Sequence, residues 1–165
     1  MDVVERARVF ATAAHAAVKQ LRKYTNEPYI VHPEEVAALV AAAPESTPDM
    51  VAAAWLHDVV EDTGVSIGTI RAEFGDEVAA LVAWLTDVEE GNRATRKRLA
   101  CERLSRAPAG AQTVKLADLI SNTRTIVAYD PSFAPVYLKE KRDLLAVLTL
   151  GDKELHERAR SQIEV

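Results

Sequence analysis

A histidine and three acidic residues stand close together after a strongly apolar stretch of the chain. The sequence there reads His57-Asp58-Val59-Val60-Glu61-Asp62-Thr63. Near the end of a helix, His57 and Asp58 could both face one metal ion. Glu61 and Asp62 follow one helical turn later, on neighbouring faces. An imidazole and carboxylates together suit a divalent ion such as Mn²⁺, Fe²⁺, Co²⁺ or Zn²⁺. Taken alone, the pattern also fits a helix end whose charged groups are simply solvated.

Two further segments carry residues of the same chemical kinds. In the apolar stretch 114–122, helical spacing places Asp118 and Asn122 on one face. A surface pair between Asp118 and Lys115, of little energetic value, is the alternative explanation. Upstream, Pro28-Tyr29-Ile30-Val31-His32-Pro33 places a histidine between a short extended segment and the start of a helix. A single histidine in that position is more often structural than a ligand, so the three segments have to be considered together.

A histidine, then His-Asp, then a distant aspartate resembles the ligand order of the HD superfamily of metal-dependent phosphohydrolases. Three blocks, 28–33, 57–63 and 115–118, look more specifically like the hydrolase domain of the bifunctional Rel/SpoT enzymes. They look equally like the free-standing small alarmone hydrolases, including the animal homologue. The resemblance runs from about Gln20 to Arg124, and the chain length fits a hydrolase without a synthetase domain. The His-Asp-x-x-Glu-Asp-Thr block is its most specific part.

The resemblance implies the reaction and the groups that perform it. Mn²⁺ is the typical ion of the family, and four residues would be its ligands: His32, His57, Asp58 and Asp118. Glu61 and Asp62 correspond to the acidic pair that positions or deprotonates the attacking water. The implied reaction is attack of this water on the 3′-pyrophosphate of guanosine tetra- or pentaphosphate. It releases pyrophosphate and leaves GDP or GTP, which would link the protein to the stringent response.

The resemblance also assigns the substrate contacts, and here the sequence departs from the family. Arg22 and Lys23 would face the substrate phosphates, and Asn122 and Thr125 would line the nucleoside side of the pocket. The family generally has a basic residue at the position of Leu119 and a histidine or an aromatic residue at that of Ser121. An aromatic side chain there could stack on the base. With the metal set intact, the sequence therefore specifies the chemistry more firmly than the guanine preference.

Two other functions remain open at this point. Another phosphorylated nucleotide, such as NADPH with its 2′-phosphate, could be the substrate of the same chemistry. A non-catalytic nucleotide-binding or scaffold domain belongs to a different class, but such a domain would often have lost Glu61-Asp62 or a metal ligand. Every expected position is filled here, which favours an enzyme.

The elements that must position these groups are helices. Alanine and leucine dominate the apolar fraction, which is 48% of the 165 residues, and no long alternating pattern indicates a sheet. The sequence thus predicts an all-α, compact HD-type bundle forming a single domain over residues 1–165. We predict helices over residues 2–23, 33–43, 48–60, 66–74, 78–85 and 93–106, with further helices after Pro108, Pro131 and Gly151.

Charge and hydropathy limit the partners. The formal net charge of −5 argues against a general nucleic-acid binder, which normally presents a basic surface. The charged start of the chain lacks the apolar core of a signal peptide, and no apolar run approaches the length of a membrane span. We therefore expect a cytoplasmic protein that binds a small nucleotide, with neither nucleic acid nor membrane as a partner. The sequence does not indicate an oligomeric state.

Overall fold

The computed structural model describes residues 1–164, and these residues form helices connected by short loops. Within this range the pairing of extended backbone is limited to one isolated bridge, between Leu21 and Pro28. The prediction of an all-α fold is confirmed. No helix in the described part of the chain is both long and apolar enough to cross a membrane.

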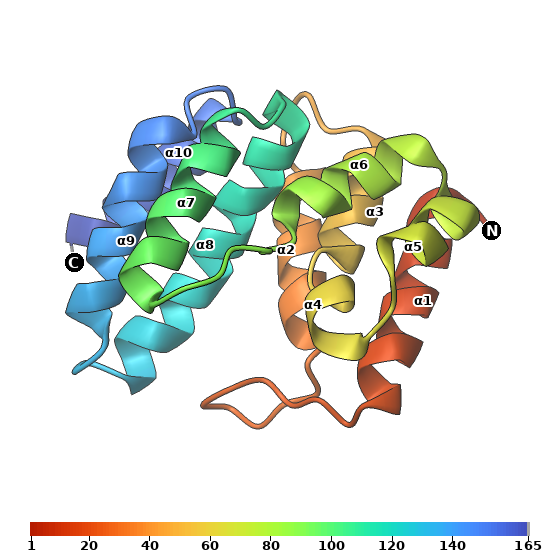
Figure 1. The fold of residues 1–165 in the computed structure, drawn as a ribbon, viewed down its shortest axis with the longest axis horizontal. Coiled ribbons are helices and arrows are strands. Elements are labelled where there is room, and N and C mark those ends of the chain that lie inside the picture. Colours follow the sequence, from red (N-terminus) through yellow and green to blue (C-terminus); the bar gives the residue numbers. More distant parts are fainter. Residues whose placement is uncertain (165) are drawn as a thin grey trace.

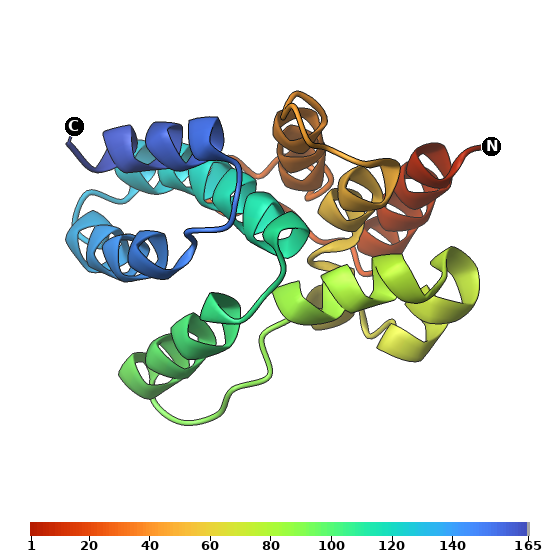
Figure 2. The same cartoon turned by 90° about the horizontal axis from the view of Figure 1, so that it is seen from above.

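The helices form two groups that meet along one long helix. The first group comprises α1 (Val3–Ala17), α2 (Val31–Ala41), α3 (Pro48–Leu56), α4 (Val59–Thr63), α5 (Ile67–Phe74) and α6 (Asp76–Leu85). The second comprises α7 (Arg93–Ser105), α8 (Ala109–Tyr129), α9 (Ala134–Val147) and α10 (Lys153–Ser161), followed by the 3₁₀ turn η1 (Gln162–Glu164). Helix α8 packs against α2, α3 and α6 of the first group and against α9 and α10 of the second (Figures 1 and 2). A side chain on α8 can therefore meet residues from both groups.

Helix α1 ends earlier than the predicted boundary at residue 23. Lys19 adopts a φ of 54°, a left-handed conformation in which an α-helix cannot continue. The chain turns back so that the amide of Gln20 donates to the carbonyl of His15 at 3.2 Å. The segment between α1 and α2, at the bottom of Figure 1, is thus a loop, and it carries Arg22 and Lys23.

The predicted helix over residues 48–60 is divided in two. Helix α3 ends at Leu56, and α4 begins at Val59. In a continuing helix the carbonyl of Ala54 would accept the amide of Asp58, but the His57 ring nitrogen Nδ1 lies 2.7 Å from that oxygen instead. The break places His57 and Asp58 in the turn between two short helices, outside both of them.

Lys141 on α9 is a charged side chain with no exposed surface. Its ammonium group donates to Thr123 Oγ1 at 2.8 Å and to Gln162 Oε1 at 2.7 Å, both of them neutral acceptors. Burial away from water disfavours the charged form and lowers the pKa of Lys141 to about 8. Lys141 thus connects α9 to α8 and to the 3₁₀ turn, but its charge has to be buried for these hydrogen bonds to form.

The substitution Lys141→Met should stabilise the protein at pH 7. The folded pKa of about 8 lies below the ordinary value of 10.5, so the unfolded chain binds more protons between these two values. Burial of the Lys141 charge therefore lowers the free energy of unfolding by its full amount below about pH 8, and this loss of stability disappears as the pH rises toward 10.5. We expect a gain of about 1–2 kcal/mol at pH 7, since lost hydrogen bonds offset part of the relieved charge burial. Thermal unfolding at pH 7 and pH 10 measures it, and the gain should shrink at the higher pH.

Lys139→Met on the same helix is the matched control, because the Lys139 side chain is 75% exposed. It should leave the unfolding temperature nearly unchanged at both pH values. If Lys141→Met were less stable than the parent protein at both pH values, the two hydrogen bonds would outweigh the burial of charge.

Candidate metal centre

Four side chains of the ligand types that bind metals converge where α2, α3 and α8 pack together. Each offers one ligand atom, and these atoms all lie within 4.8 Å of one another. The residues are His32 in the first turn of α2, His57 and Asp58 in the turn between α3 and α4, and Asp118 on α8. The fold thus brings together all four residues of the predicted ligand set, from positions as far apart in sequence as 32 and 118.

Both imidazole rings direct Nε2 toward the same carboxylate oxygen. Asp118 Oδ1 lies 2.9 Å from Nε2 of His32 and 3.2 Å from Nε2 of His57. The other nitrogen of His57, Nδ1, donates to a backbone carbonyl, that of Ala54, so Nε2 is the ring atom that would bind a metal ion. Ring nitrogens and carboxylate oxygens that face one point can hold a cation between them. A mixed set of nitrogen and oxygen donors fits a divalent transition metal.

Neighbouring groups in the cluster favour a protonated His57 and ionised Asp58 and Asp118. Burial opposes a charge on His57, but the adjacent Asp58 carboxylate and the hydrogen bond to Asp118 outweigh it and raise the pKa of His57 well above its ordinary value. Burial likewise opposes ionisation of the two aspartates. The neighbouring His57 and, for Asp118, the Lys115 ammonium reverse this effect, and both aspartate pKa values fall below their ordinary range. The carboxylates are therefore ionised at neutral pH, as metal ligands must be.

Additional hydrogen bonds hold the two carboxylates in place. The Tyr29 hydroxyl donates to Asp58 Oδ2 at 2.5 Å. The Lys115 ammonium lies 2.9 Å from Asp118 Oδ2, and the Asn122 amide donates to Asp118 Oδ1 at 3.1 Å. Helical spacing predicted the pair of Lys115 with Asp118, but the pair is largely buried at the metal centre and is not the surface pair of the alternative explanation. The contact between Tyr29 and Asp58 could not be found that way, because it joins a loop to the break after α3.

Glu61 lies on α4, close to the end of α6. Its Oε1 accepts the backbone amide of Asp87 at 2.5 Å. Although Glu61 keeps contact with solvent, partial desolvation raises its pKa to about 7. The amide hydrogen bond opposes the rise, while the carboxylates of Asp87 and Asp58 add to it. A carboxyl group with a pKa near neutrality can both accept and release a proton under physiological conditions.

Asp62, next to Glu61, is held by a chain of hydrogen bonds that runs through Gln20 to His15. The Gln20 amide donates from Nε2 to Asp62 Oδ2 at 3.1 Å, and Gln20 Oε1 lies 2.8 Å from Nδ1 of His15. His15 is almost fully buried and its ring lies against that of Tyr29, which agrees with a packed histidine. Desolvation raises the pKa of Asp62, and the hydrogen bond from Gln20 opposes the shift.

Of the predicted substrate contacts, three have partners within the protein. The Arg22 guanidinium is buried and donates to the carbonyl oxygen of Ser121 at 3.2 Å. The amide of Asn122 is bound to Asp118, and the Thr125 hydroxyl donates to the carbonyl of Asn122 at 3.2 Å. Asn122 thus adjoins the metal centre directly, while Arg22 lies behind it. Contacts between these residues and a substrate stay predictions.

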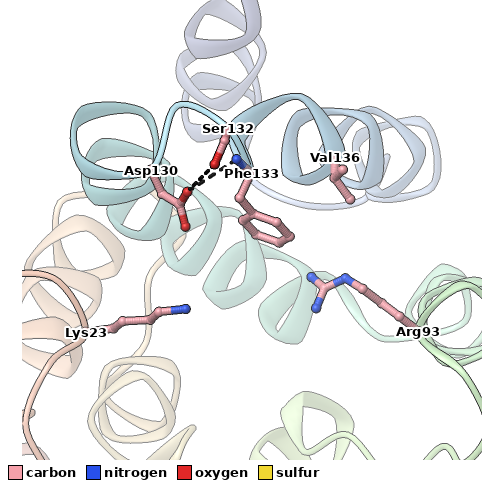
Figure 3. A pocket seen from close by; sticks show the side chains of 6 residues that line it. All are labelled: Lys23, Arg93, Asp130, Ser132, Phe133 and Val136. Carbon is pink, nitrogen blue, oxygen red and sulfur yellow. Dashed lines mark hydrogen bonds between the residues drawn. The ribbon is translucent and has the colours of Figure 1, made fainter.

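Lys23, the fourth predicted contact, lines an open cavity of about 530 Å³. Lys23 and Arg93 extend toward this space from opposite sides, as Figure 3 shows. Arg93 is paired with Glu140 through two hydrogen bonds of 2.9 Å, and its guanidinium lies 5.0 Å from the centre of the Phe133 ring. The cavity is lined by Lys23, Arg93, Asp130, Ser132, Phe133 and Val136.

Lys97 on α7 was not singled out by the sequence pattern. It is half-buried, and within residues 1–164 it forms neither a hydrogen bond nor an ion pair. Burial lowers the pKa of Lys97, and the nearby cations Lys115 and Arg93 lower it further. Its position beside Lys115 brings an additional positive charge toward the wall of α8 that carries Asp118. Only the folded arrangement of α7 and α8 could reveal this.

Comparison with known proteins gives one consistent result. Residues 7–149 match the HD domain family. A human protein named guanosine-3′,5′-bis(diphosphate) 3′-pyrophosphohydrolase is 35% identical over 127 residues, which cover 74% of this chain and 71% of the human protein. A solved structure, described as a metazoan orthologue of SpoT that hydrolyses ppGpp, superposes with a TM-score of 0.89 at 25% identity. That superposition covers 99% of this chain and 95% of the other.

The bacterial relatives are much longer proteins. A Synechocystis protein is 38% identical over 149 residues, which are 87% of this chain but only 19% of that protein. A relative from Mycobacterium leprae is likewise matched over 19% of its length. The chain therefore spans about a fifth of these two relatives and most of the animal ones.

We expect the intact protein to bind about one divalent transition-metal ion and the variant Asp118→Asn to lose that binding. Asp118 Oδ1 is the atom nearest to both imidazoles, and an amide in its place removes the negative charge that balances the ion. Calorimetric titration with Mn²⁺ measures affinity and stoichiometry, and the unfolding temperature should rise with Mn²⁺ only for the intact protein.

The variant Asp143→Asn serves as the control, because that side chain is 59% exposed and pairs with the also exposed side chain of Lys139. It should bind Mn²⁺ like the intact protein. Equal binding by Asp118→Asn would show that the ion lies elsewhere.

Proposed function

This chain belongs to the HD domain family, and from that premise we propose that it hydrolyses the 3′-pyrophosphate of guanosine tetra- or pentaphosphate. The products are pyrophosphate and GDP or GTP. The observation that carries the proposal is the convergence of His32, His57, Asp58 and Asp118, with an acidic pair one turn beyond Asp58. The named activity of the animal relatives supports this choice of substrate. The proposal takes residues 1–165 as one domain, which the packing of α8 against both helix groups supports for the described part.

The four ligands hold the metal ion, for which we propose Mn²⁺. When bound, such an ion polarises a phosphoryl oxygen and makes water more acidic. The protein contributes ligands that are already ionised and rings whose orientation is fixed by hydrogen bonds. Pre-organised ligands lower the free energy that would otherwise be spent on ordering them.

Glu61 accepts the proton of the attacking water in this proposal. Its pKa of about 7 leaves a large fraction ionised at neutral pH, and the Asp87 amide fixes one of its oxygens. Asp62, held by Gln20, positions the same water. The water oxygen forms a bond to phosphorus, the bond from phosphorus to O3′ breaks, and O3′ takes up a proton to become the hydroxyl of GDP or GTP.

Cations around the centre offset the charge of the substrate. A pyrophosphate ester repels an anionic nucleophile, so nearby positive groups lower the barrier. We propose that Lys97, which lacks a partner in the described chain, and Lys23, at the open cavity, contact substrate phosphates. Asn122 and Thr125, one turn apart on α8, would line the nucleoside side, while Arg22, which the resemblance places at the phosphates, is bound to Ser121 behind the metal centre. A cytoplasmic location and a part in the stringent response belong to the same proposal.

The test is release of GDP and pyrophosphate from guanosine tetraphosphate in the presence of Mn²⁺. We expect Glu61→Gln to lower kcat by about 10²–10⁴-fold, because the amide cannot accept a proton. Its Mn²⁺ affinity should stay close to that of the intact protein. Asp58→Ala should lose both metal binding and turnover. Glu90→Gln changes an exposed carboxylate and should leave both unchanged.

Two results would contradict the proposal in different ways. If the intact protein binds Mn²⁺ but does not cleave the alarmone, the substrate is another phosphorylated nucleotide, and NADPH at equal enzyme concentration is the next to assay. If Glu61→Gln turns over at the rate of the intact protein, Glu61 is not the base.

A further inference from the structure

The two histidines of the metal centre are held by different kinds of partner. His57 uses a backbone carbonyl, that of Ala54. His32 uses a side chain: its Nδ1 lies 2.9 Å from the hydroxyl oxygen of Ser121, which has no exposed surface. A backbone carbonyl can only accept a hydrogen bond, whereas a hydroxyl can accept or donate. The protonation state of His32 Nδ1 therefore depends on where the Ser121 proton is directed.

The surroundings of Ser121 direct its proton away from His32. Ser121 Oγ donates to Glu35 Oε2 at 2.5 Å, and an ionised carboxylate can only accept. The guanidinium of Arg22 donates to the same hydroxyl oxygen at 3.3 Å. A hydroxyl has one proton and two acceptor positions, so Ser121 has room to accept from both Arg22 and His32. His32 then carries its proton on Nδ1, and Nε2 is left free for the metal.

Arg22 completes this arrangement. Besides its bond to the hydroxyl, it donates to the Ser121 carbonyl at 3.2 Å and lies 4.0 Å from Glu35 Oε2. These are the polar contacts of a guanidinium that is only 5% exposed, within the part of the chain that the structure describes. The guanidinium therefore lies beside the Glu35 carboxylate and holds Ser121 from its other side. The side chains of three separate elements, the α1–α2 loop, α2 and α8, meet behind His32.

We propose that Glu35, Ser121 and Arg22 form a positioning relay that fixes His32 as the Nδ1–H tautomer and so sets the metal affinity of the centre. Glu35 is the residue that decides the direction, because it removes the Ser121 proton from competition for Nδ1. Without an acceptor at position 35, the hydroxyl can donate to His32 instead. That reversal moves the imidazole proton to Nε2, the atom that faces Asp118 and the metal. The inference rests on the metal centre of the proposed function, but not on the identity of the substrate.

The test compares two substitutions of Glu35 that differ in one property. Glu35→Gln retains an oxygen that can accept the Ser121 proton, whereas Glu35→Met has similar length and no acceptor. We expect Glu35→Met to weaken Mn²⁺ binding by about 10–100-fold in calorimetric titration, and Glu35→Gln to weaken it by less than about threefold. Glu34→Met, on the exposed neighbouring residue of the same helix, is the control and should bind like the intact protein. Unfolding temperatures without metal show whether each variant is folded.

A spectroscopic measurement keeps the inference testable even if Glu35→Met does not fold. In the intact protein, ¹⁵N spectra of the imidazole rings report whether His32 Nδ1 carries a proton. A protonated Nδ1 agrees with the relay, and an unprotonated Nδ1 overturns it. Equal loss of Mn²⁺ affinity in Glu35→Gln and Glu35→Met, or no loss in Glu35→Met, overturns it as well. Because metal affinity is measured without substrate, intact protein that binds Mn²⁺ but leaves the alarmone uncleaved contradicts the proposed function and not the relay.

Discussion

Two ionised carboxylates and two imidazoles share a small, largely buried volume, and most of the surrounding structure serves to make this possible. A buried charge without a partner is strongly unfavourable. Asp118 is only 6% exposed, yet His32, His57, Lys115 and Asn122 all lie within hydrogen-bonding distance of its carboxylate. These partners come from three elements of the fold. The long helix α8, a member of the second group, has to pack against the first group as well so that its carboxylate can reach His32 and His57.

The break between α3 and α4 lies at the metal centre. His57 and Asp58 keep αR backbone angles in the turn after Leu56, and the His57 ring satisfies the carbonyl of Ala54, which the interrupted helix leaves without its amide. This hydrogen bond stands at the end of the helix and orients the ring so that Nε2 faces Asp118. Local structure and metal chemistry are coupled through a single ring nitrogen.

The helical architecture could be predicted from sequence because it depends on patterns with a short period, and the resemblance to HD enzymes indicated the four residues that the fold brings together as a candidate metal centre. The sequence pattern placed the ends of α1 and α3 too late. Apolar spacing continues through Val18 and Val59, but local side-chain contacts that apolar spacing does not report, those of Gln20 with His15 and of His57 with Ala54, accompany the turns. The sequence did not indicate the contact of Glu35 with Ser121. That contact depends on which face of α2 is turned inward, a property of the assembled bundle.

The departure at Ser121 shows how the two kinds of information complement each other. By sequence it is the loss of an aromatic or histidine side chain that could stack on a base. In the fold the same residue is fully buried and accepts from His32, so a small hydroxyl residue suits the space behind the ring. Ser121 therefore acts on the metal centre, which is built of short polar contacts in the interior. The open cavity, by contrast, is bordered by the exposed Lys23 and by Arg93, already paired with Glu140. The candidate metal centre is therefore held by buried geometry, whereas the side chains at this cavity are exposed to solvent and can change without disturbing the core.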